Sequence, residues 1–470
     1  MRDACDPGVR IKDMSYAPAA VLTGSTRWVP PGPRGYSFFW RLVRHPEGWL
    51  EFLEDCARRY GDVVFFQFLG QAVCLINDPA GLEQVLVTNS QNFTKSMDYR
   101  ALARVLGQGL LTSEGGLWKR QRRLVQPAFF RERIVSYGDF MTSYAARMVD
   151  SWRDGEVRDL HDDMMQVTLE IAARSLFSVD IAGDAETIGR AMTVVMEDMP
   201  KLASASFLPA WVPVPTLGRF RRALADLDRI VYGIIGERRA TGRRTGDLLD
   251  MLLDARDENG AGMPDRQLRD EVMTLLLAGH ETTANTLAWT LYLLAQHPEV
   301  QSRLAAEVGE ARNGRLPEAG NLQQLPFTQM VLMESQRLYP PAWAIGRKAI
   351  GAFEVGGYRL AGGTNVVVSQ WVMHRDARYF PDPERFDPDR WREDSLGRRS
   401  LPKFAYLPFG AGPRVCVGAN LALTESALVL ATMMQRFRFS LAFAEPVEAF
   451  PSVTLRPRHG VRLRLERVTG

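Results

Sequence analysis

The stretch Phe409-Gly410-Ala411-Gly412-Pro413-Arg414-Val415-Cys416-Val417-Gly418 places three glycines and a proline around one cysteine. An apolar run from Ala419 to Leu430 follows directly and predicts a helix. Glycines in such a turn let the backbone approach a flat ligand closely. A cysteine just before a helix start meets backbone N–H donors and the positive end of the helix dipole, which favour a thiolate. The pattern predicts a thiolate ligand for a metal, and the alternative is a buried structural cysteine in a turn.

These ten residues resemble the haem-binding loop of the cytochrome P-450 haem-thiolate monooxygenases, FxxGxRxCxG, at every fixed position. The resemblance runs from about Pro30 to the C-terminus. It implies that Cys416 is the axial ligand of heme b iron and that Phe409 and Gly410 belong to the cofactor-binding loop. It also implies the fold of the family's soluble bacterial members, mainly α with a minor β portion, in a helix-rich triangular prism.

The sequence indicates one large domain rather than several. The 470 residues contain no linker, low-complexity run or internal repeat, so we interpret residues 30–470 as a single domain after an N-terminal extension, 1–29. A net charge of +3 gives no reason to expect a nucleic-acid partner. Four scattered cysteines without a CxxC motif predict a reducing, cytoplasmic location. The polar first 27 residues resemble neither a signal peptide nor a membrane anchor.

Local patterns predict mostly helices, with a few strands. Apolar positions at helical spacing are typical of helices over 118–125, 140–152, 217–239, 265–296, 298–311 and 327–338. A hairpin is expected from 63–68 and 73–76 around Gly70, and further strands within 353–368. Alternating apolar residues from Val453 to Leu465 predict a C-terminal hairpin around Arg458-His459-Gly460.

The segment 265–296 carries a polar interruption, Ala278-Gly279-His280-Glu281-Thr282-Thr283, in an otherwise apolar helix. Gly and Thr are poor helix formers, so a polar ligand is expected beside them, although a buried polar pair is the alternative. A zinc-protease motif HExxH would need a second His at 284, where this chain has Ala284. The segment resembles the oxygen-binding helix of the family. The resemblance implies that Gly279 gives room beside the haem, that Thr282 hydrogen-bonds the bound oxygen, and that Glu281 relays protons.

Glu334 and Arg337 lie at i and i+3 of a predicted helix that Pro340-Pro341 ends, and so share one face. They resemble the family's ExxR motif, which joins an arginine of a downstream segment, here expected to be Arg385. The resemblance implies a buried structural network. His374, a lone histidine, is interpreted as structural.

Trp118 and Arg122, spaced i and i+4, resemble the family's WxxxR motif, whose side chains contact a haem propionate. Arg347 and Arg414 stand at matching places for the same task. Two carboxylates in an apolar pocket need arginine partners. An exposed basic helix face is the alternative for residues 118–123.

Residues of the family's substrate-contacting loops fall at 97–111, 207–215 and 342–346. Large apolar side chains there favour an apolar substrate, although ordinary core packing is equally consistent with each one singly. The candidate pocket residues are Phe207, Leu208, Trp211, Trp343 and Ile345.

Taken together, the resemblance implies a monooxygenase that inserts one oxygen atom of O2 into a C–H bond of an apolar substrate such as a fatty acid or terpenoid. No electron-carrier domain is fused to the chain, so NAD(P)H-derived electrons are expected from a ferredoxin or flavodoxin and its reductase. The enzyme itself is expected to be a monomer. A peroxide-using haem-thiolate enzyme and a non-enzymatic haem sensor or carrier are the alternatives.

Overall fold

A computed structural model describes residues 29–35, 42, 45–68, 70–96, 99–181, 183–205, 216–256, 260–312 and 317–468. Nearly all of the expected N-terminal extension, residues 1–28, lies outside the described residues, as do Phe207, Leu208 and Trp211. Helices dominate the structure and strands are a minor part, so the predicted fold class is confirmed.

The predicted helices are present, although the one predicted over 140–152 begins at Arg131, and further helices occur that the apolar spacing did not predict. They are α2 (Trp49–Tyr60), α3 (Pro79–Glu83), α4 (Tyr99–Leu106), α5 (Gly115–Val125), α6 (Arg131–Asp150), α7 (Leu160–Phe177), α8 (Ala185–Ala205), α9 (Leu217–Thr241), α10 (Leu248–Asp254), α11 (Asp265–Gln296), α12 (Pro298–Arg312), α13 (Pro326–Leu338), α14 (Gln370–Met373), α15 (Leu396–Ser400) and α16 (Ala419–Met434).

The strands are short. They are β1 (Val63–Phe68), β2 (Gln71–Ile76), β3 (Phe93–Lys95), β4 (Val157–Asp159), β5 (Ile345–Ala349), β6 (Phe353–Val355), β7 (Tyr358–Leu360), β8 (Asn365–Val368), β9 (Phe437–Leu441), β10 (Ala449–Pro451), β11 (Leu455–Pro457) and β12 (Arg462–Arg467). The largest sheet has the order β1-β2-β8-β5-β3, and only its β2–β8 pair is parallel. The predicted hairpin around Gly70 is the β1–β2 pair.

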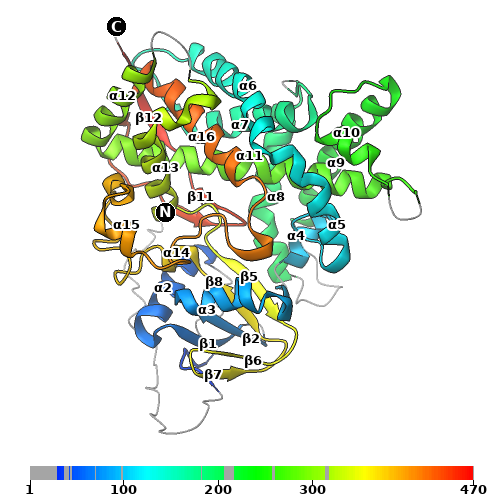
Figure 1. The fold of residues 1–470 in the computed structure, drawn as a ribbon, viewed down its shortest axis with the longest axis vertical. Helices are drawn as coiled ribbons and strands as arrows, with labels where there is room; N and C mark the ends of the chain where they lie inside the picture. Colours follow the sequence, from blue (N-terminus) through cyan, green and yellow to red (C-terminus); the bar gives the residue numbers. More distant parts are fainter. Residues whose placement is uncertain are drawn as a thin grey trace, which may run out of the picture.

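The long helix α11 runs through the middle of the helical part, while the large sheet lies with α2 and α3 at the opposite end of the molecule (Figure 1). α11 packs against α7, α9, α13 and α16, so most of its length is buried. Trp289 of α11 stacks on Tyr339, with ring centres 4.0 Å apart, and its indole N–H donates to the carbonyl of Leu455. The helix is thus fixed both to its helical neighbours and to β11.

The predicted C-terminal hairpin is wrong. β11 pairs with β10, whereas β12 pairs with β9 and β4 in another sheet, and only a single bridge joins Arg458 to Gly460. The alternation of apolar residues identified strands but could not specify their partners, because β4 and β9 are distant in sequence. No helix among the described residues has both the length and the apolar character needed to cross a membrane.

Candidate functional site

The cysteine loop connects α15 to α16 and is held by its own backbone. The Cys416 N–H donates to the carbonyl of Phe409, at 3.0 Å, and the Val415 N–H donates to Gly412. Gly412 has a positive φ of 69°, and a Cβ there would lie 1.9 Å from the carbonyl oxygen of Leu86. Only glycine therefore fits this turn, because the backbone of residue 86 lies against it. The predicted close approach to a flat ligand stays a prediction.

Cys416 is accessible to solvent, whereas the following helix α16 is buried from Thr424 to Met434. Desolvation raises the pKa of this thiol, and the Gly418 N–H and the Arg122 guanidinium oppose that rise. The thiolate expected at Cys416 stays a prediction, since it depends on a bound metal ion as well as on the helix-terminal donors. Deprotonation of this cysteine would need a coordinated metal ion, which removes a thiol proton outright.

Basic side chains surround the loop. Arg122 of α5 donates to the carbonyl of Val415, at 2.8 Å, and the Arg414 guanidinium lies 3.9 Å from the centre of the Trp118 ring. Arg414 also pairs with Glu114 and donates to the carbonyl of Ser113, at 2.9 Å. Glu114 carried no sequence signal, because nothing in its spacing relates it to Arg414.

Arg347 on β5 is the informative member of this group. It is buried, and its one hydrogen bond within the described part of the chain goes to the carbonyl of Gly346, so it has no acidic partner there. Burial lowers the pKa of Arg414, and the Arg347 charge nearby lowers it further. Two neighbouring guanidinium groups, one of them buried and without an acidic partner in the described chain, favour an anionic ligand. The propionates of a haem fit this requirement.

The predicted polar interruption in α11 is present as a local opening in a buried helix. Ala278 is exposed and Gly279 and Thr282 are half-buried, whereas Glu271–Leu277 and Thr283–Ala295 are almost entirely buried. Ala278 and Thr282 are four residues apart and so lie on one helix face. The Thr282 hydroxyl donates to the carbonyl of Ala278, at 3.0 Å. A Cβ on Gly279 would contact Ala172 at an ordinary 3.5 Å, so steric fit within the protein does not require this glycine.

Glu281 points elsewhere. Its carboxylate is buried, accepts a hydrogen bond from the Thr454 hydroxyl at 2.6 Å, and lies 3.6 Å from the Arg456 Nε. Asn285, one turn further along α11, donates to Thr454 and bonds His161 of α7. The acid is therefore fixed toward β11 and α7, on a different face from Thr282.

Glu334 and Arg337 form a fully buried ion pair on α13, with two hydrogen bonds of 2.9 and 2.8 Å. The Trp391 indole and the Asp387 N–H also donate to Glu334, at 2.8 and 3.1 Å. The predicted third member, Arg385, is wrong: its side chain is exposed and only its carbonyl accepts from Arg337, while Arg390 lies 3.3 Å from Glu334.

His374 joins this pair to the cysteine loop. The Arg337 guanidinium donates to the His374 carbonyl, at 2.9 Å, and the His374 Nε2 accepts the Leu407 N–H, at 3.0 Å. Burial, with the charges of Arg337 and Arg375, lowers the pKa of His374 to about 3, so the ring stays neutral and able to accept. These contacts agree with the interpretation of His374 as a structural residue, which holds Leu407, two residues before the cysteine loop.

Of the candidate pocket residues, Trp343 and Ile345 are described. The Trp343 indole donates to the carbonyl of Ser452, at 2.9 Å, and the ring packs against the sheet core, which makes it largely a packing residue. Ile345 faces the cysteine loop, because a Cβ on Gly410 would lie 3.3 Å from its Cδ1.

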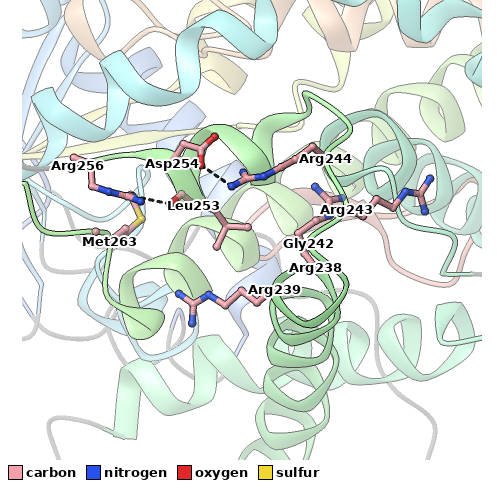
Figure 2. Close-up of a pocket in the computed structure, with 10 residues that line it drawn as sticks. Arg238, Arg239, Gly242, Arg243, Arg244, Leu253, Asp254, Arg256 and Met263 are labelled. Atoms are coloured by element: carbon pink, nitrogen blue, oxygen red, sulfur yellow. Dashed lines mark hydrogen bonds and ion pairs between the residues drawn. The ribbon is translucent and has the colours of Figure 1, made fainter.

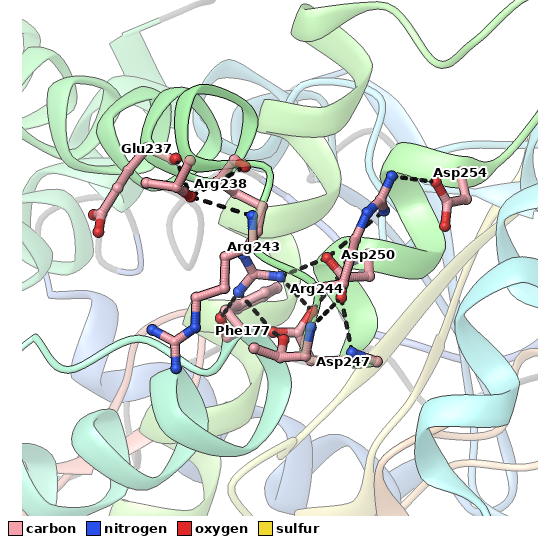
Figure 3. Close-up of polar contacts among 11 residues, drawn as sticks. Phe177, Glu237, Arg238, Arg243, Arg244, Asp247, Asp250 and Asp254 are labelled. Carbon is pink, nitrogen blue, oxygen red and sulfur yellow. Dashed lines mark hydrogen bonds and ion pairs between the residues drawn. The ribbon is translucent and has the colours of Figure 1, made fainter.

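A polar pocket lined by arginines lies between the ends of α9 and α10 and the segment that precedes α11 (Figure 2). Arg244 pairs with Asp254 there, and Arg239 and Arg243 extend away from each other. Buried Arg238 is held between Asp247 and Asp250 (Figure 3). These cations are mostly paired and complement the negative end of α9, so they stabilise a helix terminus rather than form a ligand site.

The chain is similar to known proteins over most of its length. The cytochrome P450 family profile matches residues 30–462. The chain is 38% identical to cyclooctat-9-en-7-ol 5-monooxygenase of Streptomyces melanosporofaciens, over 84% of this chain and 86% of the relative. It is 37% identical to cyclooctatin synthase of the same organism, over 89% of each, and 33% identical to pentalenene oxygenase of Streptomyces avermitilis, over 91% and 94%.

The chain therefore belongs to the cytochrome P450 family. It is a monooxygenase of that family, as the cysteine loop predicted.

Arg390 and Arg385 form a matched pair for testing the buried network. Arg390→Ala should lower the free energy of unfolding by about 1.5 kcal/mol, because Glu334 loses a charge-assisted hydrogen bond while its pair with Arg337 remains. Arg385→Ala keeps the carbonyl that Arg337 uses and should change stability by less than about 0.5 kcal/mol. Chemical denaturation of both variants measures the difference, and equal stability losses would mean that Arg390 is not part of the network.

Proposed function

We propose that this enzyme hydroxylates a terpenoid, inserting one oxygen atom of O2 into a C–H bond. The observation that carries the proposal is the Cys416 loop with an unpaired buried Arg347 beside it. Three relatives are named for terpene chemistry: a cyclooctat-9-en-7-ol monooxygenase, cyclooctatin synthase and pentalenene oxygenase. These names favour a terpenoid over a fatty acid.

The proposed cofactor is heme b, held by residues already positioned around the loop. Cys416 would be its axial ligand, Phe409 and Gly410 would support the loop beside it, and Arg347 and Arg414 would meet its propionates, with Trp118 and Arg122 behind them. When bound through a thiolate, such a haem supplies the electron-rich iron at which O2 is activated. The protein would thus provide one ligand and at least two compensating cations.

Thr282 and Glu281 are proposed to serve proton delivery from different positions. The Thr282 hydroxyl lies on the open face of α11 and can both accept and donate a hydrogen bond. Glu281 is buried within reach of Thr454 and Arg456 and would resupply protons after a side-chain rotation. Gly279 keeps the same face of the helix free of a side chain. Ile345, which faces the loop, would contact the substrate.

The electron donor is proposed to be a separate ferredoxin or flavodoxin with its NAD(P)H-dependent reductase. Lys119 and Arg123 are exposed on α5, the helix whose Arg122 contacts the cysteine loop. An acidic carrier protein would be attracted to this basic face of α5. The same helix contacts Val415, the residue before Cys416, through Arg122.

The function is tested with purified enzyme, a bacterial ferredoxin and its reductase, NAD(P)H, and a panel of cyclic diterpene alcohols and sesquiterpenes. Isotopically labelled O2 should place one labelled oxygen in the product. A product formed only with added peroxide would favour a peroxide-using enzyme, and haem binding without any oxygen uptake would favour a sensor or carrier.

Cys416→His tests the axial ligand. The reduced carbon monoxide complex of the wild-type protein should absorb at the position typical of thiolate ligation. The histidine variant should lose that band and all hydroxylation, because a neutral imidazole is a weaker electron donor than a thiolate. Cys74→Ser, at a buried cysteine, is the control and should keep the band. A histidine variant that retained the thiolate band would contradict the assignment.

Thr282→Ala should separate electron use from product formation. Haem content should be unchanged, while product per NAD(P)H oxidised should fall about tenfold and hydrogen peroxide should rise, since a proton-donating hydroxyl is lost. Thr283→Ala is the matched control, because that hydroxyl is buried and bonded to the Gly279 carbonyl, at 3.2 Å. If Thr283→Ala uncouples and Thr282→Ala does not, the role belongs to Thr283.

The double variant Lys119→Glu and Arg123→Glu should slow reduction by an acidic ferredoxin about tenfold at low ionic strength, and less at high salt, because charge-driven association is screened. Arg229→Glu with Arg266→Glu makes the same charge change at exposed positions of α9 and α11. Stopped-flow reduction rates decide the question. Equal slowing in both double variants would place the docking surface elsewhere.

A further inference from the structure

Two consecutive buried acids near the start of α11 have no part in the chemistry described above. Asp270 and Glu271 are 3% and 0% exposed. Burying two adjacent carboxylates is costly unless donors compensate them. One donor to each carboxylate comes from the segment Gly107–Ser113, which connects α4 to α5 and has no regular secondary structure to satisfy its backbone.

The contacts form a clasp between that segment and α11. The Gln108 N–H donates to Asp270, at 2.8 Å, and the Leu110 N–H donates to Glu271, at 3.1 Å. Gln267, one turn earlier on α11, donates both to the Gln108 carbonyl and to Glu271, at 3.2 and 3.0 Å. Arg269 pairs with Asp270, at 3.0 Å, so one of the two carboxylates is also charge-compensated.

Glycines allow the close approach that the clasp needs. A Cβ on Gly109 would lie 2.0 Å from the Thr274 hydroxyl and 2.5 Å from the Asp270 carbonyl oxygen. Gly107 has a positive φ of 54°, and a Cβ there would collide with the Asp270 carboxylate at 2.1 Å. The segment is therefore pressed directly onto the backbone and side chains of α11.

The place of contact relates the clasp to the substrate side of the site. Thr274, Ala278 and Thr282 are spaced four residues apart and lie on one face of α11, about 6 Å per step. The segment thus covers the turn immediately before the open part of that face. At its other end, the Ser113 carbonyl accepts from Arg414, two residues before Cys416.

We propose that Asp270 and Glu271 are positioning residues that hold Gly107–Ser113 as a fixed wall of the substrate cavity, between the open face of α11 and the cysteine loop. The segment follows directly after α4, which packs on α8 and α11. The clasp therefore also fixes the end of that helix. The effect of these residues on substrate discrimination rests on the proposed function. The contacts that form the clasp do not depend on that function. Desolvation raises the pKa of Glu271 to about 7 despite the Leu110 and Gln267 bonds, with Asp270 adding to the rise, in keeping with an acid fixed in an apolar setting.

The first test inserts a wedge. Gly109→Ala should force the segment off α11, whereas Gly116→Ala, where a Cβ meets nothing within 4 Å, should not. Hydrogen exchange followed by mass spectrometry on the holoenzyme should show amides of 107–113 exchanging about tenfold faster in Gly109→Ala and unchanged in Gly116→Ala. Asp270→Asn removes the charge without a change in volume and should give the same loosening, so it decides the outcome if the wedge variant does not fold.

The second test measures the shape of the cavity. Imidazole and 4-phenylimidazole bind the same ferric iron position and differ mainly in size, so the ratio of their dissociation constants reports on the walls. That ratio should change by about threefold or more in Gly109→Ala and Asp270→Asn, and remain at the wild-type value in Gly116→Ala and in Arg266→Ala, at an exposed neighbour on α11.

Unchanged exchange of 107–113 in both Gly109→Ala and Asp270→Asn would overturn the clasp. Faster exchange with an unaltered ligand ratio would show that the segment is not a wall of the cavity. If the thiolate-type carbon monoxide band were absent from every protein, wild type and Gly116→Ala included, the proposed function would be refuted. Hydrogen exchange would then still test the clasp by itself.

Discussion

The buried ion pair of Glu334 and Arg337 is the interaction on which the rest of the site depends. Both side chains are inaccessible to solvent, and their remaining hydrogen-bonding groups are used by backbone and by Trp391. The Arg337 guanidinium donates hydrogen bonds to the carbonyls of His374, Pro383 and Arg385. One side chain therefore fixes three points of the long irregular segment before the cysteine loop. A buried pair of this kind contributes less as net stability than as a constraint on conformation, which is our interpretation of its role here.

The constraint passes to the cysteine through neutral His374. Because its Nε2 accepts the Leu407 N–H, the start of the Phe409–Gly418 loop is fixed from below, while Arg122 holds Val415 from the side of α5. Gly412 then presses against the Leu86 carbonyl and leaves no room for another backbone path. The loop is therefore held at three points by elements distant in sequence, which suits a ligand that must meet a rigid cofactor at a fixed position.

The sequence predicted those parts of the site that depend on spacing within one element. The cysteine loop, the interruption of α11 and the i,i+3 pair on α13 could be predicted because each consists of residues close together in the sequence. Arg390 was missed in favour of Arg385, since both occur in an irregular segment where periodicity gives no direction for a side chain. The C-terminal hairpin failed for a similar reason, because strand partners come from tertiary packing. Glu114, His374 and the clasp residues act through contacts that no local pattern encodes.

Buried acids and the buried arginine Arg347 differ in whether the protein itself supplies a partner. Most buried acids, including Glu334, Asp270 and Glu281, have donors at hydrogen-bonding distance within the described chain. Arg347 is different, since it is buried with only a backbone carbonyl as a partner there and faces a second arginine. Glu425 also lacks a partner for one buried oxygen, but burial raises the pKa of this acid well above its usual range, so it can stay neutral, whereas an arginine keeps its charge. A buried arginine without an acidic partner in the described chain therefore favours a partner from outside the polypeptide. The unpaired arginine thus supports the proposed pairing with a haem propionate, and its position near the cysteine loop is consistent with that proposal.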